Sequence, residues 1–492
     1  MDKKIPTDNL TEKQKDYATF LPAMSSFFAR DLGKARHEED YIKPERIPQN
    51  FEHGVEGLNY MKSKDTYFYY KWHLYSAGHA DLNMKKFSVR DDIIRQRDRN
   101  DNWLLGDSGG FQIGKGVWEG DWKDPTCPKA KKKREQVLEF MDGNMDYGMI
   151  LDIPAWVSRS PEGAKASNIN SYQEAVDGTR INNDYFMKNR NGNCKFLNVL
   201  QGENFQQADD WYLQMKDYCD PKKYPSTHFN GWAMGGQNMC DIHLALKRLV
   251  ALRFDGLLEK GKHDVMHFLG TSKLEWAVLL TDVQRAVRKY HNENFMITFD
   301  CASPFLASAN GQVYTDIEIK DKKKWVYRML PSADDKAFAK DTRSFREAVL
   351  EKGIFPAFRD SPVSARWMLK DITCYNPGDL NKMKNDPKTS WDSFSYTLQM
   401  AHNVWTHIKA VQEANEAYDK GINPKMLVEE KFDRIAFRDI VNAVFATSSR
   451  DEANAVIEEF QRFWMSIIGT RGATGKKTVN ASTQFQNLFE EV

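Results

Sequence analysis

Short apolar runs that each end in a polar residue or a glycine recur along the first two thirds of the chain. Six of these runs end at Asp107, Asp152, Gln201, Gly235-Gly236, Gly270 and Asp300, at intervals of 30 to 49 residues. Apolar residues recur near helical spacing in the stretches between them, such as 205–218, 240–254 and 273–290. Strand and helix alternating at this interval are typical of parallel βα units.

The pattern predicts an α/β protein built on a (β/α)8 barrel. Six units are visible, and the chain upstream has room for two more, with an aromatic, strand-like stretch at 66–75 and an apolar patch at 20–28. The alternative is a doubly wound sheet, which usually carries a glycine-rich nucleotide turn; neither G-x-G-x-x-G nor G-x-x-x-x-G-K-[ST] occurs in the sequence. Because the loops after barrel strands share one rim, Asp107, Asp152, Gln201 and Asp300 are expected to converge there.

The pattern changes after Asp300 and suggests four regions. We expect an N-terminal extension at 1–60, a barrel core at 61–315, an irregular insertion at 316–390, and C-terminal helices that complete the barrel at 391–492. The C-terminal helical extension is predicted over 393–418, 432–445 and 449–468. Residues 470–492 are polar and are expected to form a poorly ordered end.

Composition excludes little. The 492 residues are 41% hydrophobic and 28% charged, and the net charge of +1 neither requires nor excludes a nucleic-acid partner. Two basic runs, 129–134 and 320–324, fit either solvated loops or phosphate contacts. Six cysteines without a C-x-x-C pair, a polar N-terminus and no apolar run near 18 residues predict a reduced, cytoplasmic protein with free thiols and no membrane segment.

The expected rim has a chemical interpretation. Two carboxylates that face one cavity suit displacement at a glycosidic carbon, where one attacks the carbon and the other moves protons to and from the leaving group. Asp300 and Asp107 are the candidates for this pair. Asp152 and Gln201 offer the acceptor and donor groups that read the edge of a planar heterocycle such as guanine. The alternative is that each strand-end aspartate only caps a helix.

Several motifs then show a resemblance to a known family. D-S-G-G-F-Q at 107–112 is similar to the hallmark of the tRNA-guanine transglycosylase superfamily. So are, in matching order, L-Q-G-E at 200–203, G-W-A-M-G-G at 231–236, F-L-G at 268–270, F-D-C-A-S-P at 299–304 and N-G-Q at 310–312. M-A-H-N at 400–403 resembles the last helix of the family. The resemblance covers roughly residues 100–315.

The resemblance implies roles for individual residues. Asp300 falls at the nucleophile that forms a covalent glycosyl-enzyme intermediate, and Asp107 at the general acid/base. Phe111 would stack on the base. The remaining base-binding positions of the family fall on Ser108, Asp152, Gln201, Gly231 and Trp232. The implied reaction is base exchange, in which guanine leaves and a 7-deazaguanine enters while the polymer is never cut. No cofactor is implied.

Two departures from the family bear on the substrate. After the proline of the F-D-C-x-x-P motif, tRNA enzymes carry T-R-x-G-R, whose arginines hold the anticodon loop, whereas residues 305–309 here read F-L-A-S-A. The zinc motif of the family is also missing, and near its place only Cys374 is found. One thiolate does not make a four-ligand zinc site, so no bound metal is expected.

These departures make the chain most similar to the 7-deazaguanine DNA transglycosylases of phages and bacteria, the DpdA family. The expected partners are DNA, single-stranded or locally opened, and a 7-deazaguanine base, with 7-cyano-7-deazaguanine as the expected one. The expected location is the cytoplasm (of the host, if phage-encoded). No oligomeric state is implied. The alternatives are a diverged tRNA-guanine transglycosylase of the queuosine or archaeosine type and a non-catalytic nucleic-acid-binding paralogue. Retention of both Asp107 and Asp300 argues against the paralogue.

Overall fold

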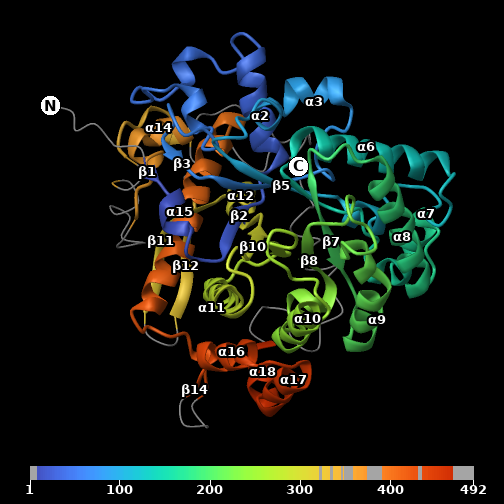
Figure 1. Cartoon of the computed structure of the whole chain (residues 1–492). Coiled ribbons are helices and arrows are strands. Elements are labelled where there is room, and N and C mark those ends of the chain that lie inside the picture. Colours follow the sequence, from blue (N-terminus) through green and yellow to red (C-terminus); the bar gives the residue numbers. More distant parts are fainter. Residues whose placement is uncertain are drawn as a thin grey trace.

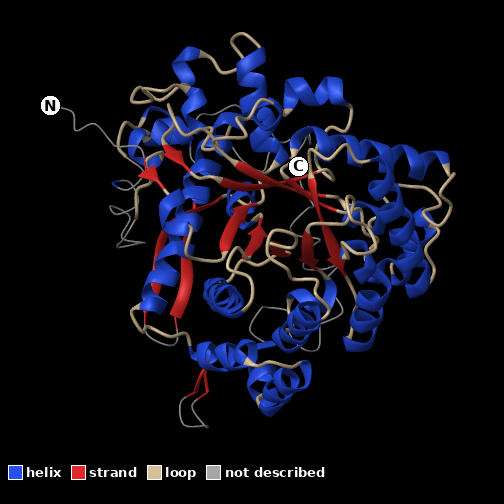
Figure 2. Cartoon of the chain, in the orientation of Figure 1, coloured by secondary structure: helices blue, strands red, loops and turns tan. Residues whose placement is uncertain are grey.

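Eight parallel strands lie at the centre of the molecule with helices around them (Figure 1 and Figure 2). The structure is a computed structural model, and it describes residues 8–320, 324–332, 336–344, 347, 358–373, 391–429 and 435–468. The expected zinc-region residue Cys374 and the polar end at 470–492 lie outside these ranges.

The strands form a nearly closed barrel and follow chain order around it. They are β2 (Thr19–Pro22), β4 (Trp72–Ser76), β5 (Trp103–Asp107), β6 (Tyr147–Met149), β7 (Lys195–Leu200), β8 (Gly231–Met234), β9 (Val265–Phe268) and β10 (Met296–Cys301). β10 pairs with β2 in parallel, so the last strand lies beside the first. The seam between β2 and β4 is a single bridge from Ala23 to Leu74, where the Met24 amide donates to the Leu74 carbonyl at 2.9 Å. The predicted (β/α)8 barrel is confirmed.

The outer layer consists of helices that follow the strands. The longer ones are α2 (Ser26–His37), α6 (Pro128–Asn144), α8 (Tyr172–Asn189), α9 (Phe205–Met215), α10 (Ile242–Phe254), α11 (Leu274–Tyr290) and α15 (Ser393–Asp419). Shorter helices fill the connections: α1 (Thr11–Gln14), α3 (Met84–Arg90), α4 (Asp92–Arg95), α5 (Gly110–Gly114), α7 (Pro161–Ser167), α12 (Ser303–Ala309) and α14 (Leu369–Ile372). Side-chain caps fix where several begin, because Asn204 and Asp241 accept from backbone amides in the first turns of α9 and α10.

The segment expected to be an N-terminal extension contributes to the barrel. The apolar patch at 20–28 divides into the end of the fully buried β2 and the start of α2, which Ser25 caps. These two elements make up the first βα unit. The short strands β1 (Asp8–Asn9) and β3 (Phe68–Tyr69) pair with each other outside the barrel. The barrel therefore begins well before residue 61.

The region after β10 is also more regular than expected. An antiparallel hairpin, β11 (Gln312–Lys320) and β12 (Lys324–Pro331), occupies the start of the segment that the sequence suggested was irregular. Its first strand buries Val313, Tyr314, Thr315 and Ile317, while its ends are more exposed. The charged residues in this stretch hide the strand in the sequence. The hairpin packs on α15, which also contacts α11 and α12 and so closes the outer layer.

The C-terminal helices agree with the sequence apart from their ends. The 393–418 prediction corresponds to α15, and the 432–445 prediction corresponds to α16 (Phe437–Ala446). The 449–468 prediction divides at Phe460 into α17 (Arg450–Glu459) and α18 (Gln461–Ile468). A small hairpin, β13 (Val428–Glu429) and β14 (Ile435–Ala436), precedes α16.

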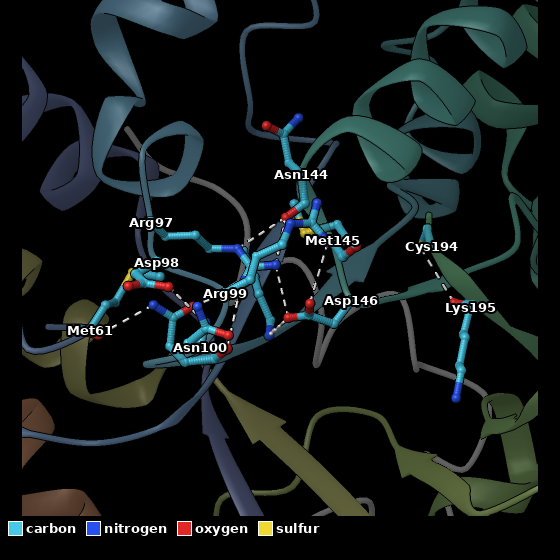
Figure 3. A network of polar contacts seen from close by, with 12 residues as sticks. Met61, Arg97, Asp98, Arg99, Asn100, Asn144, Met145, Asp146, Cys194 and Lys195 are labelled. Atoms are coloured by element: carbon cyan, nitrogen blue, oxygen red, sulfur yellow. Dashed lines mark hydrogen bonds and ion pairs between the residues drawn. The ribbon is translucent and has the colours of Figure 1, made fainter. Parts of the chain in front are cut away.

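A network of polar contacts ties β5 and β6 together at the N-terminal rim (Figure 3). Asp146, directly before β6, accepts from the Leu104 amide at 2.8 Å and lies 2.8 Å from a guanidinium nitrogen of Arg97. Arg97 and Arg99 also donate to carbonyl oxygens at the C-terminal end of α6, including that of Asn144. The negative charge of Asp146 and the carbonyl oxygens at the end of α6 both face the positive charges of Arg97 and Arg99, of which the Arg97 side chain is buried.

Two further expectations concern the membrane and the thiols. Within the described ranges, none of the helices combines the length and the apolar character needed to cross a bilayer. The five cysteines in those ranges, Cys127, Cys194, Cys219, Cys240 and Cys301, are free thiols.

Candidate active site

A cavity opens at the carboxyl ends of the barrel strands, and the predicted rim residues meet in it. Its polar lining consists of Asp107, Asp152, Gln201 and Asp300. Its apolar walls include Leu74, Phe111, Met149, Trp156, Val199, Met239 and Leu269. Four glycines, Gly110, Gly235, Gly236 and Gly270, also line it. Buried carboxylates in an apolar cavity at this rim are typical of a barrel active site.

Asp107 ends β5, and the turn after it requires glycine. Gly109 has φ of 75°, and a Cβ there would lie 2.7 Å from the Gly78 amide nitrogen, so the D-S-G-G turn packs too closely for any side chain. The Ser76 hydroxyl donates to Asp107 Oδ2 at 2.5 Å. Burial raises the pKa of Asp107 and the negative charge of Asp300 raises it further, which outweighs the opposing effect of the Ser76 bond. The protonated form of Asp107 is therefore easier to reach than that of an exposed aspartate.

Asp300 lies near the end of β10, with one carboxylate oxygen held by the neighbouring strand. Its Oδ1 accepts from the Gly270 amide at 2.8 Å and lies 3.2 Å from Nε2 of His267, on β9. Its own backbone carbonyl accepts from the Thr271 amide at 2.6 Å. The other oxygen, Oδ2, has no hydrogen bond or ion pair with any part of the chain that the structure describes, so it is the oxygen available to a ligand.

Asp152 and Gln201 make a hydrogen-bonded pair on neighbouring strands. Gln201 Nε2 donates to Asp152 Oδ2 at 2.7 Å, and both side chains are almost fully buried. Burial, with a smaller contribution from the charge of Asp107, raises the pKa of Asp152 to about 7. A carboxylate and an amide held this way present acceptors and a donor side by side, a pattern complementary to the hydrogen-bonding edge of a purine.

Aromatic rings form one wall of the cavity. Phe111, on α5, lies 5.5 Å from Trp156 between ring centroids, and both rings line the cavity. A tilted aromatic pair of this kind offers a flat apolar surface to a planar ligand. Gly235 leaves room for the side chain of Gln201, because a Cβ at position 235 would lie 2.8 Å from Nε2 of Gln201.

Three of the expected base-binding residues do not reach the cavity. Ser108 is fully buried and does not line it. Gly231 and Trp232 begin β8, at the opposite end of the strand, and the indole nitrogen of Trp232 donates to the Leu257 carbonyl at 2.8 Å, away from the barrel interior. The β8 residues that line the cavity are Gly235 and Gly236, at its carboxyl end. The G-W-A-M-G-G motif therefore contributes its last two glycines to the cavity, and Gly231 and Trp232 do not line it.

Sequence reasoning missed residues that support the carboxylates. His267 lies inside an apolar strand, and Ser76 ends β4. A polar residue in each of these runs was a visible signal, but its partner depends on the alignment of adjacent strands. Gly270, expected only as a strand end, supplies the amide that binds Asp300.

The helix directly after β10 is apolar. On α12, Phe305 is buried against Phe28, with ring centroids 5.7 Å apart, and the helix carries no cation. The basic run at 129–134 is partly engaged within the protein: Lys129 pairs with Glu119, Lys133 lies over the Trp118 ring and Arg134 donates to Asn182. Of the second run, 321–323 lie outside the described residues.

No cluster of three or more metal-ligating side chains occurs in the described ranges. Since Cys374 lies outside them, the expected absence of zinc stays a prediction. Comparison with models of known protein families and with curated proteins finds no match to this chain.

Proposed function

We propose that this chain is a DNA-guanine transglycosylase, a pentosyltransferase that replaces guanine in DNA with a 7-deazaguanine base, 7-cyano-7-deazaguanine being the base we expect. The observation that carries the proposal is the convergence of Asp107 and Asp300 on one buried cavity beside the Asp152–Gln201 pair. A nucleophile, a proton donor and a purine-reading edge are the three functions that base exchange requires.

The first half of the reaction breaks the bond between the sugar and guanine. Oδ2 of Asp300 attacks C1′ of the target deoxynucleotide and forms an ester bond to it, while the C1′–N9 bond breaks. Asp107 in its acid form gives its proton to N9, so guanine leaves as the neutral base. The raised pKa of Asp107 favours the protonated form that this step needs.

The second half reverses these roles with a different base. The incoming 7-deazaguanine gives its N9 proton to the Asp107 carboxylate, and N9 attacks C1′. The ester bond breaks and the Asp300 carboxylate is restored. No phosphodiester bond is made or broken. Throughout, Asp152 accepts from N–H groups on the purine edge, Gln201 orients Asp152, and Phe111 and Trp156 pack against the ring.

The choice of DNA rests on α12. A helix with a buried Phe305 and no cation lacks the charge with which the similar tRNA enzymes hold an anticodon loop. The target guanine must leave the base stack to enter the cavity, which costs a few kcal/mol in a duplex and less in a single strand. Activity should therefore be higher on single-stranded or locally opened DNA, and binding should weaken with salt where exposed lysines meet phosphates.

The test is incubation of the protein with a labelled 7-deazaguanine and either DNA or tRNA, followed by nucleoside mass spectrometry. Label in DNA, lost in the Asp300→Asn variant, supports the proposal. Label in tRNA alone would favour a diverged tRNA-guanine transglycosylase instead. Label in neither polymer, with binding retained, would favour a nucleic-acid-binding protein without this activity.

A further inference from the structure

Oδ1 of Asp300 has two polar contacts among the described residues. They are the Gly270 amide, at 2.8 Å, and Nε2 of His267, at 3.2 Å. His267 lies on β9, is completely buried and is directly opposite Thr298 in the register of β9 and β10. Thr298 and Asp300 are two residues apart on β10, so both project to the same face of the strand. The three side chains therefore form a line across two adjacent strands, from Thr298 through the imidazole to the carboxylate.

The contacts of the imidazole indicate that Nε2 carries a hydrogen. Nδ1 lies 2.9 Å from the Thr298 hydroxyl oxygen. Nε2 lies 3.2 Å from Asp300 Oδ1, a close electrostatic contact without hydrogen-bond geometry, and makes no hydrogen bond in the described part of the chain. An ionised carboxylate only accepts hydrogen bonds, so Nε2 must carry a hydrogen for this contact to be favourable. The Thr298 hydroxyl can then donate to Nδ1, an arrangement that leaves the ring hydrogen on Nε2.

We infer that His267 is a positioning residue for the nucleophile: with the Gly270 amide it holds Oδ1 of Asp300 so that Oδ2 faces the sugar carbon. The inference rests on the proposed function. During the reaction Oδ1 becomes the carbonyl oxygen of the glycosyl ester, and negative charge returns to the carboxylate when the ester breaks. A donor aimed at Oδ1 favours the restored carboxylate and so assists the second half of the exchange.

The neighbourhood of His267 makes this arrangement rigid. Gly270 follows His267 by three residues, so β9 and the turn directly after it supply both groups that contact Oδ1. On the far side of β10, Thr298 pairs in register with Thr19 of β2, which fixes the strand that carries both the threonine and the nucleophile. A completely buried side chain with a contact at each ring nitrogen orients a carboxylate at a small entropic cost.

The first test does not depend on catalysis. Nitrogen-15 NMR of histidine-labelled protein, with His267→Gln used to assign the signal, should report a protonated Nε2 and an unprotonated Nδ1 at neutral pH. The Thr298→Val variant should lose this fixed tautomer. A wild-type signal from an Nδ1–H tautomer would overturn the inference, whether or not the protein exchanges bases.

The second test measures the two halves of the reaction. His267→Phe should lower kcat about 10- to 100-fold, the usual effect of removing a donor that faces a charged group. The KM for the incoming base should stay within about twofold, because His267 does not line the cavity. The covalent adduct should accumulate to a larger fraction, and His267→Gln, which retains a donor, should recover part of the rate.

His73→Phe is the matched control. His73 is a completely buried barrel histidine on β4 that packs against the rings of Tyr60 and Tyr70 and not against a carboxylate. Its variant should keep the wild-type kcat once its folded fraction is measured. If His267→Phe folds and exchanges at the wild-type rate, the inference is wrong; if wild-type protein exchanges no base, the proposed function fails and the NMR result decides the inference alone.

Discussion

The two rims of the barrel surround their carboxylates with different neighbours. At the N-terminal rim, the Asp146 carboxylate faces Arg97 and Arg99 and accepts from a backbone amide (Figure 3). At the C-terminal rim, neither Asp107 nor Asp152 has a lysine or arginine partner in the described residues, and burial raises the pKa of both. Charge balance stabilises a fold, whereas unbalanced buried carboxylates cost stability and are retained where they perform chemistry.

The largest effect should come from removing the nucleophile at the C-terminal rim. Asp300→Asn should lower base exchange at least about a thousandfold and abolish the covalent adduct, because an amide is a poor nucleophile at C1′. A denaturing gel with labelled DNA and a thermal melt check this outcome. The melting temperature should not fall, since the variant removes a buried charge. Near-normal exchange by a folded Asp300→Asn protein would remove Asp300 from this role.

Removing the proton donor should have the next largest effect. Asp107→Asn should lower exchange about 10²- to 10⁴-fold, the usual contribution of a positioned acid or base. Asparagine still accepts from the Ser76 hydroxyl, so the turn after β5 is preserved. Single-turnover kinetics on DNA would measure the loss. If the loss is severalfold only, another group moves the proton.

The N-terminal rim should show the reverse behaviour. Asp146→Ala should lower the free energy of unfolding by about 2–3 kcal/mol, because it leaves the buried Arg97 guanidinium without its carboxylate. The kcat of the folded fraction should stay within about twofold. Asp217→Ala, which removes an exposed pair with Lys223, is the control and should cost less than about 1 kcal/mol. If urea titrations show that the two variants lose the same free energy of unfolding, the difference that we infer between the rims is wrong.

The smallest effect concerns pH. Asp152 must be ionised to accept from the N–H groups of the base, and its pKa is about 7, so affinity for the base should fall up to about tenfold per pH unit as pH decreases below 7. Asp152→Asn should bind the base more weakly, with the pH dependence removed. Calorimetric titrations between pH 5 and pH 8 would measure both, and pH-independent binding by the wild type would exclude this role for Asp152.

The same group should affect stability with the opposite sign. The pKa is higher in the folded protein than in the unfolded chain, so the folded state binds this proton more tightly. The stability it contributes is present at low pH and is lost as pH rises through about 7. Without ligand, Asp152→Asn should therefore be more stable than the wild type at pH 8, by about 1–3 kcal/mol. A lower melting temperature for this variant at pH 8 would contradict the expectation.

The barrel could be predicted from the sequence because each strand is a short apolar run with an abrupt polar end. The convergence of Asp107, Asp152, Gln201 and Asp300 follows from that pattern and from the geometry of parallel strands. The support of Asp300 by His267 could not be predicted, since it depends on how β9 and β10 align. The place of Trp232 could not be predicted either, because a motif does not say where in a strand it begins. Trp232 lies early in β8, and its indole nitrogen donates to the Leu257 carbonyl.

The pairing of β10 with β2 has a consequence for synthesis. The strand that carries the nucleophile is the last barrel strand to leave the ribosome, and it completes its pairing on the first, Thr298 beside Thr19. Long-range pairing of this kind is slow to form, because the whole intervening chain must be organised first. A nascent chain that ends before residue 296 would contain Asp152 and Gln201 but not Asp300. The activity that we propose would therefore arise only at the final stage of folding.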